Sequence, residues 1–200
     1  MGNIAKTKAI RVLRSQGGTL RTSDILGLGI HPRTLYELRD SGKVTQITRG
    51  VYRLAEEPPT ENIELTAAAM RVPDGVICLI SALSFHRITN EVPHEVYLAI
   101  PKGRQKPKLD YPPIRVFRFS SEAYSAGIEK HAIDGTQVKI YSIEKTVADC
   151  FKFRNRIGLD VALEALRICI RNKGSRQKIL EFARVCRVER VIRPYLEAIQ

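Results

Sequence analysis

The stretch formed by residues 22–54 constrains the fold more than any other part of the sequence. Pro32 suits the first position of a helix, and Gly42 suits the left-handed conformation that often ends one, so we predict a helix that begins at Pro32 and ends at Ser41-Gly42. Leu35 and Leu38, three positions apart, turn one face of this helix inward. The remaining face carries Arg33, Thr34, Tyr36, Glu37, Arg39 and Asp40.

A shorter helix precedes this one, and two strands follow it. Residues 44–47 and 51–54 predict a hairpin around Thr48-Arg49-Gly50, with Arg49 at its tip. Helix, turn, helix and hairpin is the order of parts in a winged helix-turn-helix. The major groove of DNA admits an α-helix, and arginine binds guanine edges or phosphate there. We therefore predict that this stretch binds DNA, although winged helices also serve as protein–protein modules.

The distribution of charge supports DNA binding. The chain carries a net charge of +12, with a pI near 9.8. Residues 1–54 contain three Lys and seven Arg against three acids, a net charge of +7, whereas the remaining 146 residues carry +5. Positive charge concentrated on one segment is typical of a phosphate-binding surface. Low aromatic content and the absence of Trp argue against a platform that stacks single-stranded bases.

The acids and prolines of residues 56–59 predict a domain boundary, because such a run cannot continue a strand. We expect a DNA-binding domain at residues 1–57 and a second domain at residues 58–200. The second domain should contain strands at residues 76–80, 95–100, 114–119 and 138–141, and helices capped at Ser81 and Ser142. The chain is predicted to be helical from Asp160 onward. The predicted fold class is a two-domain α+β or α/β protein: an N-terminal winged helix-turn-helix, then a mixed α/β domain that ends in a helical tail.

The cysteines and the hydropathy indicate a cytoplasmic protein. Cys78, Cys150, Cys169 and Cys186 show no C-x-x-C spacing and stand in apolar contexts, as expected of buried free thiols in a reducing compartment. The N-terminus has no apolar signal core, and the longest apolar run, residues 76–80, is too short to span a bilayer. We expect no membrane association.

Catalytic motifs are missing from the second domain. It has neither a phosphate-binding loop nor a nucleophile elbow. His86 and His94 lack a third metal ligand, so they are interpreted as structural. Ser142, Glu144, Lys145 and Asp149 are interpreted as a helix cap, a helix N-terminal acid and an ordinary polar helix face. We expect no catalytic residues, no metal and no cofactor, and hence no enzyme.

Two further basic features stand outside the first domain. The loop at residues 101–108 carries Lys102, Arg104, Lys106 and Lys108 without an acid. Near the C-terminus, arginines recur at every third position: Arg184, Arg187, Arg190 and Arg193. They form one stripe if a single helix continues through them, and separate groups if residues 186–188 form a turn. For the loop, contacts to the DNA backbone and a solvated surface both remain open. For the arginines, of which Arg184 and Arg187 are the candidates for DNA, contact with an acidic partner remains open as well.

Four segments in fixed order resemble a known family. RGVYRL at the end of the hairpin is followed by VICLISALSFHRIT, VYLAIPKG and VKIYSIEKTVADCFKF, and then by the helical tail. This order resembles the AbiEi-type antitoxins of bacterial type IV toxin–antitoxin systems. The resemblance covers nearly the whole chain and rests on the ordered set rather than on any single segment.

The resemblance implies an antitoxin that is also a transcriptional autorepressor. Its N-terminal domain would bind inverted repeats, as double-stranded DNA, in the promoter of its own operon. Its C-terminal domain would counteract a toxin that resembles a nucleotidyltransferase, without need of a stable complex. The DNA-reading positions of the family fall on Arg33, Thr34, Tyr36, Arg39 and Arg49, of which Arg33 and Thr34 are expected to read bases. Lys43 and Arg53 are then candidates for phosphate contacts.

Two other classes of function stay open at this point. A winged-helix nuclease or DNA-processing enzyme would need a cluster of carboxylates for its metal ions, which the sequence lacks. A pure protein-interaction module would not bind duplex DNA in a salt-sensitive way. The sequence has no heptad seam for a dimer, so we expect a monomer that binds DNA cooperatively.

Overall fold

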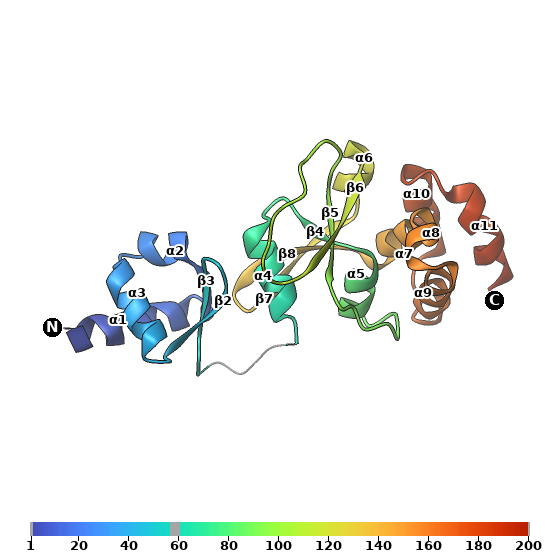
Figure 1. Ribbon diagram of the computed structural model, residues 1–200. Coiled ribbons are helices and arrows are strands. Elements are labelled where there is room, and N and C mark those ends of the chain that lie inside the picture. Colours follow the sequence, from blue (N-terminus) through green and yellow to red (C-terminus); the bar gives the residue numbers. More distant parts are fainter. Residues whose placement is uncertain (1, 57–60, 200) are drawn as a thin grey trace. The chain divides into compact units, whose positions relative to one another are not determined.

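The computed structural model describes residues 2–56 and 61–199 (Figure 1). Its two compact units are Met1–Pro73 with Lys108–Pro112 and His131–Val138, and Asp74–Pro107 with Pro113–Lys130 and Lys139–Gln200. The predicted boundary after residue 57 lies outside the described residues. The elements are mixed, as predicted: helices and two sheets of three and five strands.

The first unit begins with six elements, which we call the N-terminal module. They are α1 (Gly2–Ser15), β1 (Thr19–Arg21), α2 (Thr22–Gly27), α3 (Pro32–Asp40), β2 (Val44–Thr48) and β3 (Val51–Leu54). The strands form an antiparallel sheet in the order β1-β3-β2. The same unit also contains α4 (Ile63–Arg71).

Helix α3 has the bounds that its sequence predicts. The imidazole of His31 accepts a hydrogen bond from the backbone N–H of Arg33 at 3.2 Å, which caps the helix just before Pro32. Gly42 adopts φ +71° after the last turn, and the N–H of Lys43 donates to the carbonyl of Leu38 at 2.9 Å. This pattern closes the C-terminus of the helix.

Packing inside the N-terminal module fixes which face of α3 is exposed. Leu35 and Leu38 are fully buried among apolar side chains of α1, α2 and the sheet. The other members of this core are Ala9, Leu13, Ile25, Ile30, Val44, Tyr52 and Leu54. Burial of the two leucines holds the opposite, polar face of α3 at the surface.

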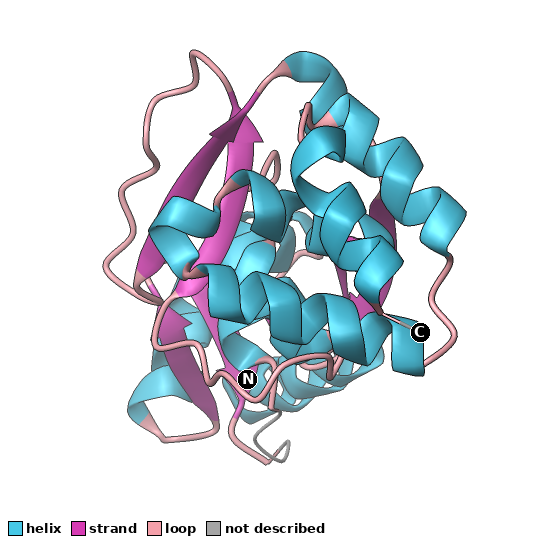
Figure 2. Ribbon diagram, turned by 90° about the vertical axis from the view of Figure 1, so that its right-hand side faces the viewer, coloured by secondary structure: helices cyan, strands magenta, loops and turns pink. Residues whose placement is uncertain are grey.

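The five-stranded sheet has the order β6-β5-β4-β8-β7. Strand β4 pairs antiparallel with β5 and parallel with β8, and β5 pairs parallel with β6. The strands are β4 (Val76–Ile77), β5 (Val96–Pro101), β6 (Ile114–Phe119), β7 (Ile128–Ile133) and β8 (Thr136–Tyr141). The helices of the second unit are α5 (Leu79–Phe85), α6 (Ser121–Ser125), α7 (Ile143–Lys152), α8 (Arg154–Ile157), α9 (Leu159–Arg171), α10 (Arg176–Val185) and α11 (Glu189–Ala198). Helices α7–α11 gather into one bundle, which faces the viewer in Figure 2.

The strand predicted at residues 76–80 is wrong beyond its second residue. Cys78 is still extended, but Leu79 adopts φ +47° and begins α5, two residues before the predicted cap at Ser81. A short, fully apolar run fits a buried strand and a buried helix equally well, because neither has a polar face to set a period. Strand β7 and helix α6 were not predicted.

The polar face predicted for α7 is also wrong, because Lys145 and Asp149 are completely buried. Their Nζ and Oδ2 atoms lie 2.5 Å apart, and neither side chain is exposed. The thiol of Cys186 donates to the other carboxylate oxygen at 3.1 Å. The ammonium group also lies 4.0 Å from the ring centroid of Tyr141 and 4.9 Å from that of Phe119. A charge pair thus stands in the apolar core of the second unit, while the predicted cap at Ser142 is confirmed.

Replacing Lys145 with Met should lower the free energy of unfolding by about 3–5 kcal/mol, because the carboxylate of Asp149 would stay buried without its partner. Burial raises the pKa of Asp149, and Lys145 opposes this effect. In the variant the folded state should therefore bind a proton more readily than the unfolded state. The loss of stability should be smallest below the ordinary Asp pKa of 3.8 and grow as the pH rises above it. Urea unfolding of the variant and the wild type over a pH series measures this difference.

The double variant Lys145→Met with Asp149→Leu serves as the control. Its apolar side chains need no counter-charge, so it should recover most of the lost stability and the difference from wild type should no longer grow with pH. A single variant as stable as the wild type at neutral pH would contradict the burial of the pair.

Candidate nucleic-acid interface

The exposed face of α3 carries the residues that the sequence predicts to read DNA. The side chain of Arg33 is 84% exposed, and Tyr36 and Arg39 also lie at the surface. Thr34 is half-buried. Arg33 and Thr34 belong to the first turn of the helix, which is the part of a recognition helix that leads into a groove.

Charged neighbours hold these side chains in place. Glu37 accepts from Nε of Arg33 at 3.0 Å and lies 3.1 Å from Nζ of Lys6, which comes from α1. The hydrogen bond from Lys6, and then that from Arg33, lowers the pKa of Glu37. Arg39 pairs with Asp40 at 2.8 Å, and its guanidinium carbon lies 5.1 Å from the ring centroid of Tyr36. The sequence did not predict the contact of Lys6, because it joins two elements that only the fold brings together.

The hairpin between β2 and β3 presents Arg49 at its tip, as predicted. Gly50 takes φ +76°, which L-amino acids with a Cβ rarely adopt, and its carbonyl accepts from the N–H of Thr22 at 2.9 Å. This bond ties the turn to the start of α2. The exposed side chain of Arg49 therefore projects from an anchored turn.

The two residues predicted to contact phosphate differ in exposure. Lys43 is exposed, at 3.7 Å from Glu56. Arg53 is only 8% exposed, because it lies in β3, the central strand of its sheet. A guanidinium group with so little accessible surface is a poor ligand for phosphate, so Arg53 does not enter the interface described below.

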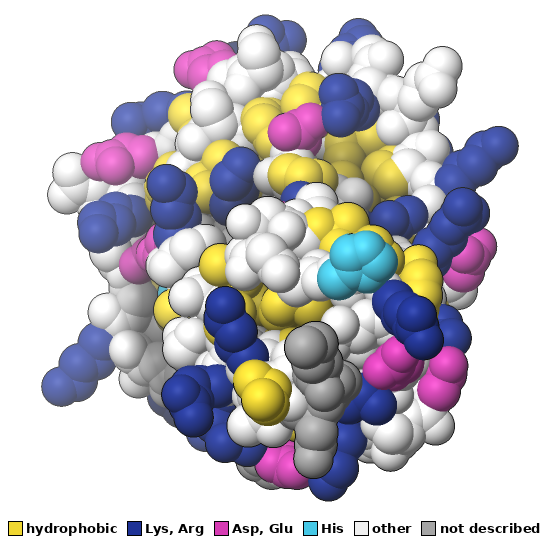
Figure 3. All heavy atoms as spheres, turned by 90° about the vertical axis from the view of Figure 1, so that its left-hand side faces the viewer, with side chains coloured by type: hydrophobic (Ala, Val, Ile, Leu, Met, Phe, Trp, Pro, Cys, Tyr) yellow, Lys and Arg dark blue, Asp and Glu magenta, His cyan; other side chains and the backbone are white. Residues whose placement is uncertain are grey.

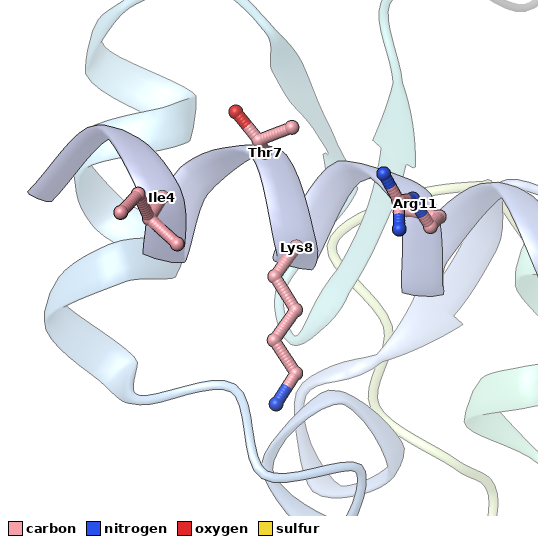
Figure 4. A pocket seen from close by; sticks show the side chains of 4 residues that line it. All are labelled: Ile4, Thr7, Lys8 and Arg11. Atoms are coloured by element: carbon pink, nitrogen blue, oxygen red, sulfur yellow. The ribbon is translucent and has the colours of Figure 1, made fainter.

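Helix α1 adds further cations to the surface of the N-terminal module. Lys8 and Arg11 line a hollow of about 420 Å³ with Ile4 and Thr7, and Figure 4 shows Lys8 extending to the side opposite Thr7. In Figure 3, Lys and Arg side chains spread over this face of the molecule, with hydrophobic atoms and a few acids between them. The surface is thus basic without being a single continuous patch.

The secondary basic residues lie in separate places. Lys102, Arg104 and Lys106 are exposed in the second unit, where Arg104 pairs with Asp74 at 2.7 Å, whereas the exposed Lys108 belongs to the first unit.

The C-terminal arginines do not form one helical stripe. Arg187 takes φ +60° in a turn between α10 and α11. Arg184 pairs with Glu189 at 3.0 Å, and Arg184, Arg187 and Arg190 line a hollow of about 310 Å³. The turn that the sequence left as an alternative is confirmed.

His86 and the four cysteines have structural environments, whereas His94 is exposed. Nε2 of His86 lies 2.8 Å from the carbonyl oxygen of Tyr141. All four cysteines are buried and free, as predicted. Within residues 2–56 and 61–199, no group of three or more His, Cys, Asp or Glu side chains is placed to hold a metal ion.

The comparisons with known proteins find one family that the N-terminal module is similar to. Residues 8–55 match the family model described as a transcriptional regulator, AbiEi antitoxin. The resemblance predicted from the sequence is confirmed over this segment, which contains α2, α3 and the β2–β3 hairpin. No curated protein matches the chain.

One solved structure has a similar fold over almost the whole chain. It is the crystal structure of the protein Rv2827c from Mycobacterium tuberculosis, with 14% sequence identity and a TM-score of 0.55. The match covers 97% of this chain and 82% of that one. The likeness in fold therefore extends from the AbiEi-matched segment through the second unit.

Among the helices of the described residues, none combines the length and the hydropathy that a membrane span requires.

The contact between Lys6 and Glu37 predicts a measurable change in pKa. In the wild type, the side-chain carboxyl of Glu37 should titrate below its ordinary value of 4.5, because Lys6 and Arg33 favour its charged form. Lys6→Ala removes the largest cause and should move the midpoint back up toward that value. Carbon-13 NMR of the side-chain carboxyl group, followed over a pH series, measures the midpoint.

Lys8→Ala is the matched control. It removes the same charge from the same helix, but Lys8 is not among the groups that shift Glu37. Equal midpoints for the Lys6 and Lys8 variants would contradict the contact between α1 and α3.

Proposed function

We propose that this protein is a transcriptional autorepressor whose N-terminal module is a winged helix-turn-helix that binds double-stranded operator DNA. The observation that carries the proposal is the two-sided character of α3. Leu35 and Leu38 are buried, and the opposite face presents Arg33, Tyr36 and Arg39 to solvent. This helix lies inside the segment that matches the AbiEi family of transcriptional regulators.

In this proposal α3 enters the major groove with its first turn leading. Arg33 can form two hydrogen bonds with the edge of a guanine, and Thr34 can bind a neighbouring base. The present partner of Arg33 is Glu37, in an exposed pair. Exposed ion pairs contribute little free energy, so exchanging Glu37 for a base costs little. Tyr36 and Arg39 follow on the next turn and extend the same surface.

The β2–β3 hairpin is the wing, and its role is to hold the protein on the backbone. Arg49 at the tip and Lys43 just before β2 are both exposed, and each can neutralise a phosphate. Such contacts fix the position of α3 without reading the sequence. Inverted repeats would take two monomers, which bind cooperatively.

The second part of the proposal is an antitoxin role for the second unit. It is supported by the description of the matched family and by the order of motifs along the second half of the chain. The protein would counteract a nucleotidyltransferase-like toxin of a type IV system without a stable complex and without catalysis of its own.

Replacing Arg33 with Ala should cost roughly 1–3 kcal/mol of binding free energy at the operator and relax the base preference at one position, because the bond to a base edge is lost. Arg49→Ala should weaken binding to all duplexes about equally and reduce the slope of log K against log salt concentration by about one. Fluorescence anisotropy titrations of operator and scrambled duplexes at several salt concentrations separate the two effects.

Arg171→Ala, which removes an exposed charge from α9, is the matched control and should bind as the wild type does. If Arg33→Ala also binds the operator with wild-type affinity, α3 is not the recognition helix.

The two proposed roles should be separable. A full chain with Arg33→Ala and Arg39→Ala should fail to repress its own promoter, yet should still restore growth when it is expressed with the neighbouring toxin gene from an unrelated promoter. Reporter output and growth, measured in the same cells, check this. Loss of growth rescue at equal protein level would mean that toxin control requires the DNA-binding surface.

A further inference from the structure

An aromatic cluster lies beside β6, which is an edge strand of the five-stranded sheet. The rings of Tyr97 and Phe117 stack with centroids 5.6 Å apart. Phe153, the residue between α7 and α8, packs against Phe117 and Phe119 at 5.1 Å each. Tyr97, Phe117 and Phe119 are buried. The cluster is therefore a rigid support for whatever covers it.

Three cations cover this cluster. The guanidinium carbon of Arg156 lies 4.0 Å from the ring centroid of Phe117, and that of Arg115 lies 5.9 Å from the same ring. Nζ of Lys152 lies 5.8 Å from the centroid of Phe119. Lys152 and Arg156 also share Phe153, each at 5.9 Å. Each of the three charges thus lies 5.9 Å or less from a ring of this one cluster, and we call Arg115, Lys152 and Arg156 together the β6 cationic surface.

Hydrogen bonds fix Arg115 on this surface. It donates to the hydroxyl of Tyr97 at 3.2 Å and to the backbone carbonyl of Arg156 at 3.3 Å. Its ion-pair partner Glu95 is 3.7 Å away. Over residues 2–56 and 61–199, neither Lys152 nor Arg156 forms an ion pair, so the surface keeps a positive excess.

The geometry suits phosphate. The exposed guanidinium group of Arg156 lies over the ring of Phe117 and can direct N–H donors to solvent, in a fork that matches a phosphate group. Both terminal nitrogens of Arg115 already donate to Tyr97 and to the carbonyl of Arg156, so Arg115 contributes its charge rather than a free fork. Because the rings hold these groups in place before binding, less side-chain entropy is lost when a ligand arrives. Tyr97, Phe117 and Phe119 are buried and Phe153 is half-buried, so the cluster offers little free ring surface on which a base could stack.

We infer that Arg115, Lys152 and Arg156 form a second phosphate-binding surface, which contacts the nucleic-acid backbone without reading its sequence. A protein partner would need exposed apolar or aromatic side chains for the centre of its interface, whereas three of the four rings here are buried and the fourth, Phe153, is half-buried. Interfaces with nucleic acid are more polar and much more positively charged. The surface lies in the second unit and is independent of α3 and its predicted contacts.

The test uses the full chain with Arg115→Gln, Lys152→Gln and Arg156→Gln, made in the wild type and in a chain that also carries Arg33→Ala and Arg49→Ala. Binding to the upstream duplex and to a scrambled duplex of equal length is titrated over a range of salt concentrations. Each cation that neutralises a phosphate contributes about 0.9 to the slope of log K against log salt concentration. The three substitutions should therefore reduce the slope by roughly two to three units, equally on both duplexes and in both backgrounds.

Two control variants isolate the cause of that change. Arg167→Gln, Arg171→Gln and Lys178→Gln remove the same charge from exposed positions of α9 and α10, and should change the slope by less than one unit. Arg115→Lys with Arg156→Lys keeps the charge and should keep most of the slope, which also shows that loss of binding is not loss of folding.

The outcomes separate this inference from the repressor proposal. Sequence-independent binding that falls with the triple substitution supports the β6 cationic surface even if the upstream duplex is not preferred. Unchanged slopes in both backgrounds overturn it. If the slopes stay unchanged but binding to polyglutamate is lost, the surface belongs to an acidic protein partner and the inference is wrong.

Discussion

The second unit depends on one buried charge pair. Removing Lys145 and Asp149 from water is costly, and the surroundings offset that cost with the 2.5 Å contact between them, the thiol of Cys186 and the ring of Tyr141. The backbone at residue 127 also leaves room for the lysine. A residue larger than Gly127 would place its Cβ only 2.7 Å from Cβ of Lys145. These partners come from β8, α7 and the α10–α11 turn. All three segments must therefore be in their native positions before the two buried charges have their contacts. The pair therefore acts as a constraint on how the helical bundle meets the sheet.

The N-terminal module reaches its form by a simpler route. Two buried leucines orient α3, a histidine caps its start and a glycine closes its end. The ion pairs on its polar face, such as that of Arg33 with Glu37, lie at the surface, where exchanging a partner costs little free energy. The same chain thus holds charge in two ways. Lys145 and Asp149 satisfy each other inside the second unit, whereas Arg33, Arg39 and Arg49 of α3 and the hairpin are exposed to solvent, where we propose that they bind phosphate and bases.

The sequence predicts elements best where periodicity and turn residues agree. Helix α3, the β2–β3 hairpin and the cap at Ser142 have this agreement, whereas the DNA contacts assigned to α3 and the hairpin stay a prediction. The β7–β8 hairpin was missed although Asp134 and Gly135 form its turn with φ +49° and +72°, because the consecutive polar residues Glu129, Lys130 and His131 interrupt the alternating pattern of β7. Lys145 and Asp149 are four positions apart in α7, which is also the spacing of ion pairs on exposed helix faces. Sequence spacing alone does not show whether such a pair is buried. For the same reason the sequence does not show that Arg53 is buried, because its burial follows from the position of β3 in the centre of the sheet.

The most direct test of the account is a gel-shift titration of the full chain on the DNA upstream of its own gene, against a scrambled duplex of equal length, at two salt concentrations. We predict tighter binding to the upstream DNA, with affinity for both duplexes falling as salt rises because phosphate contacts release counterions. Equal, salt-insensitive binding, or no binding to either duplex, would contradict it and would indicate that the exposed face of α3 serves a protein partner.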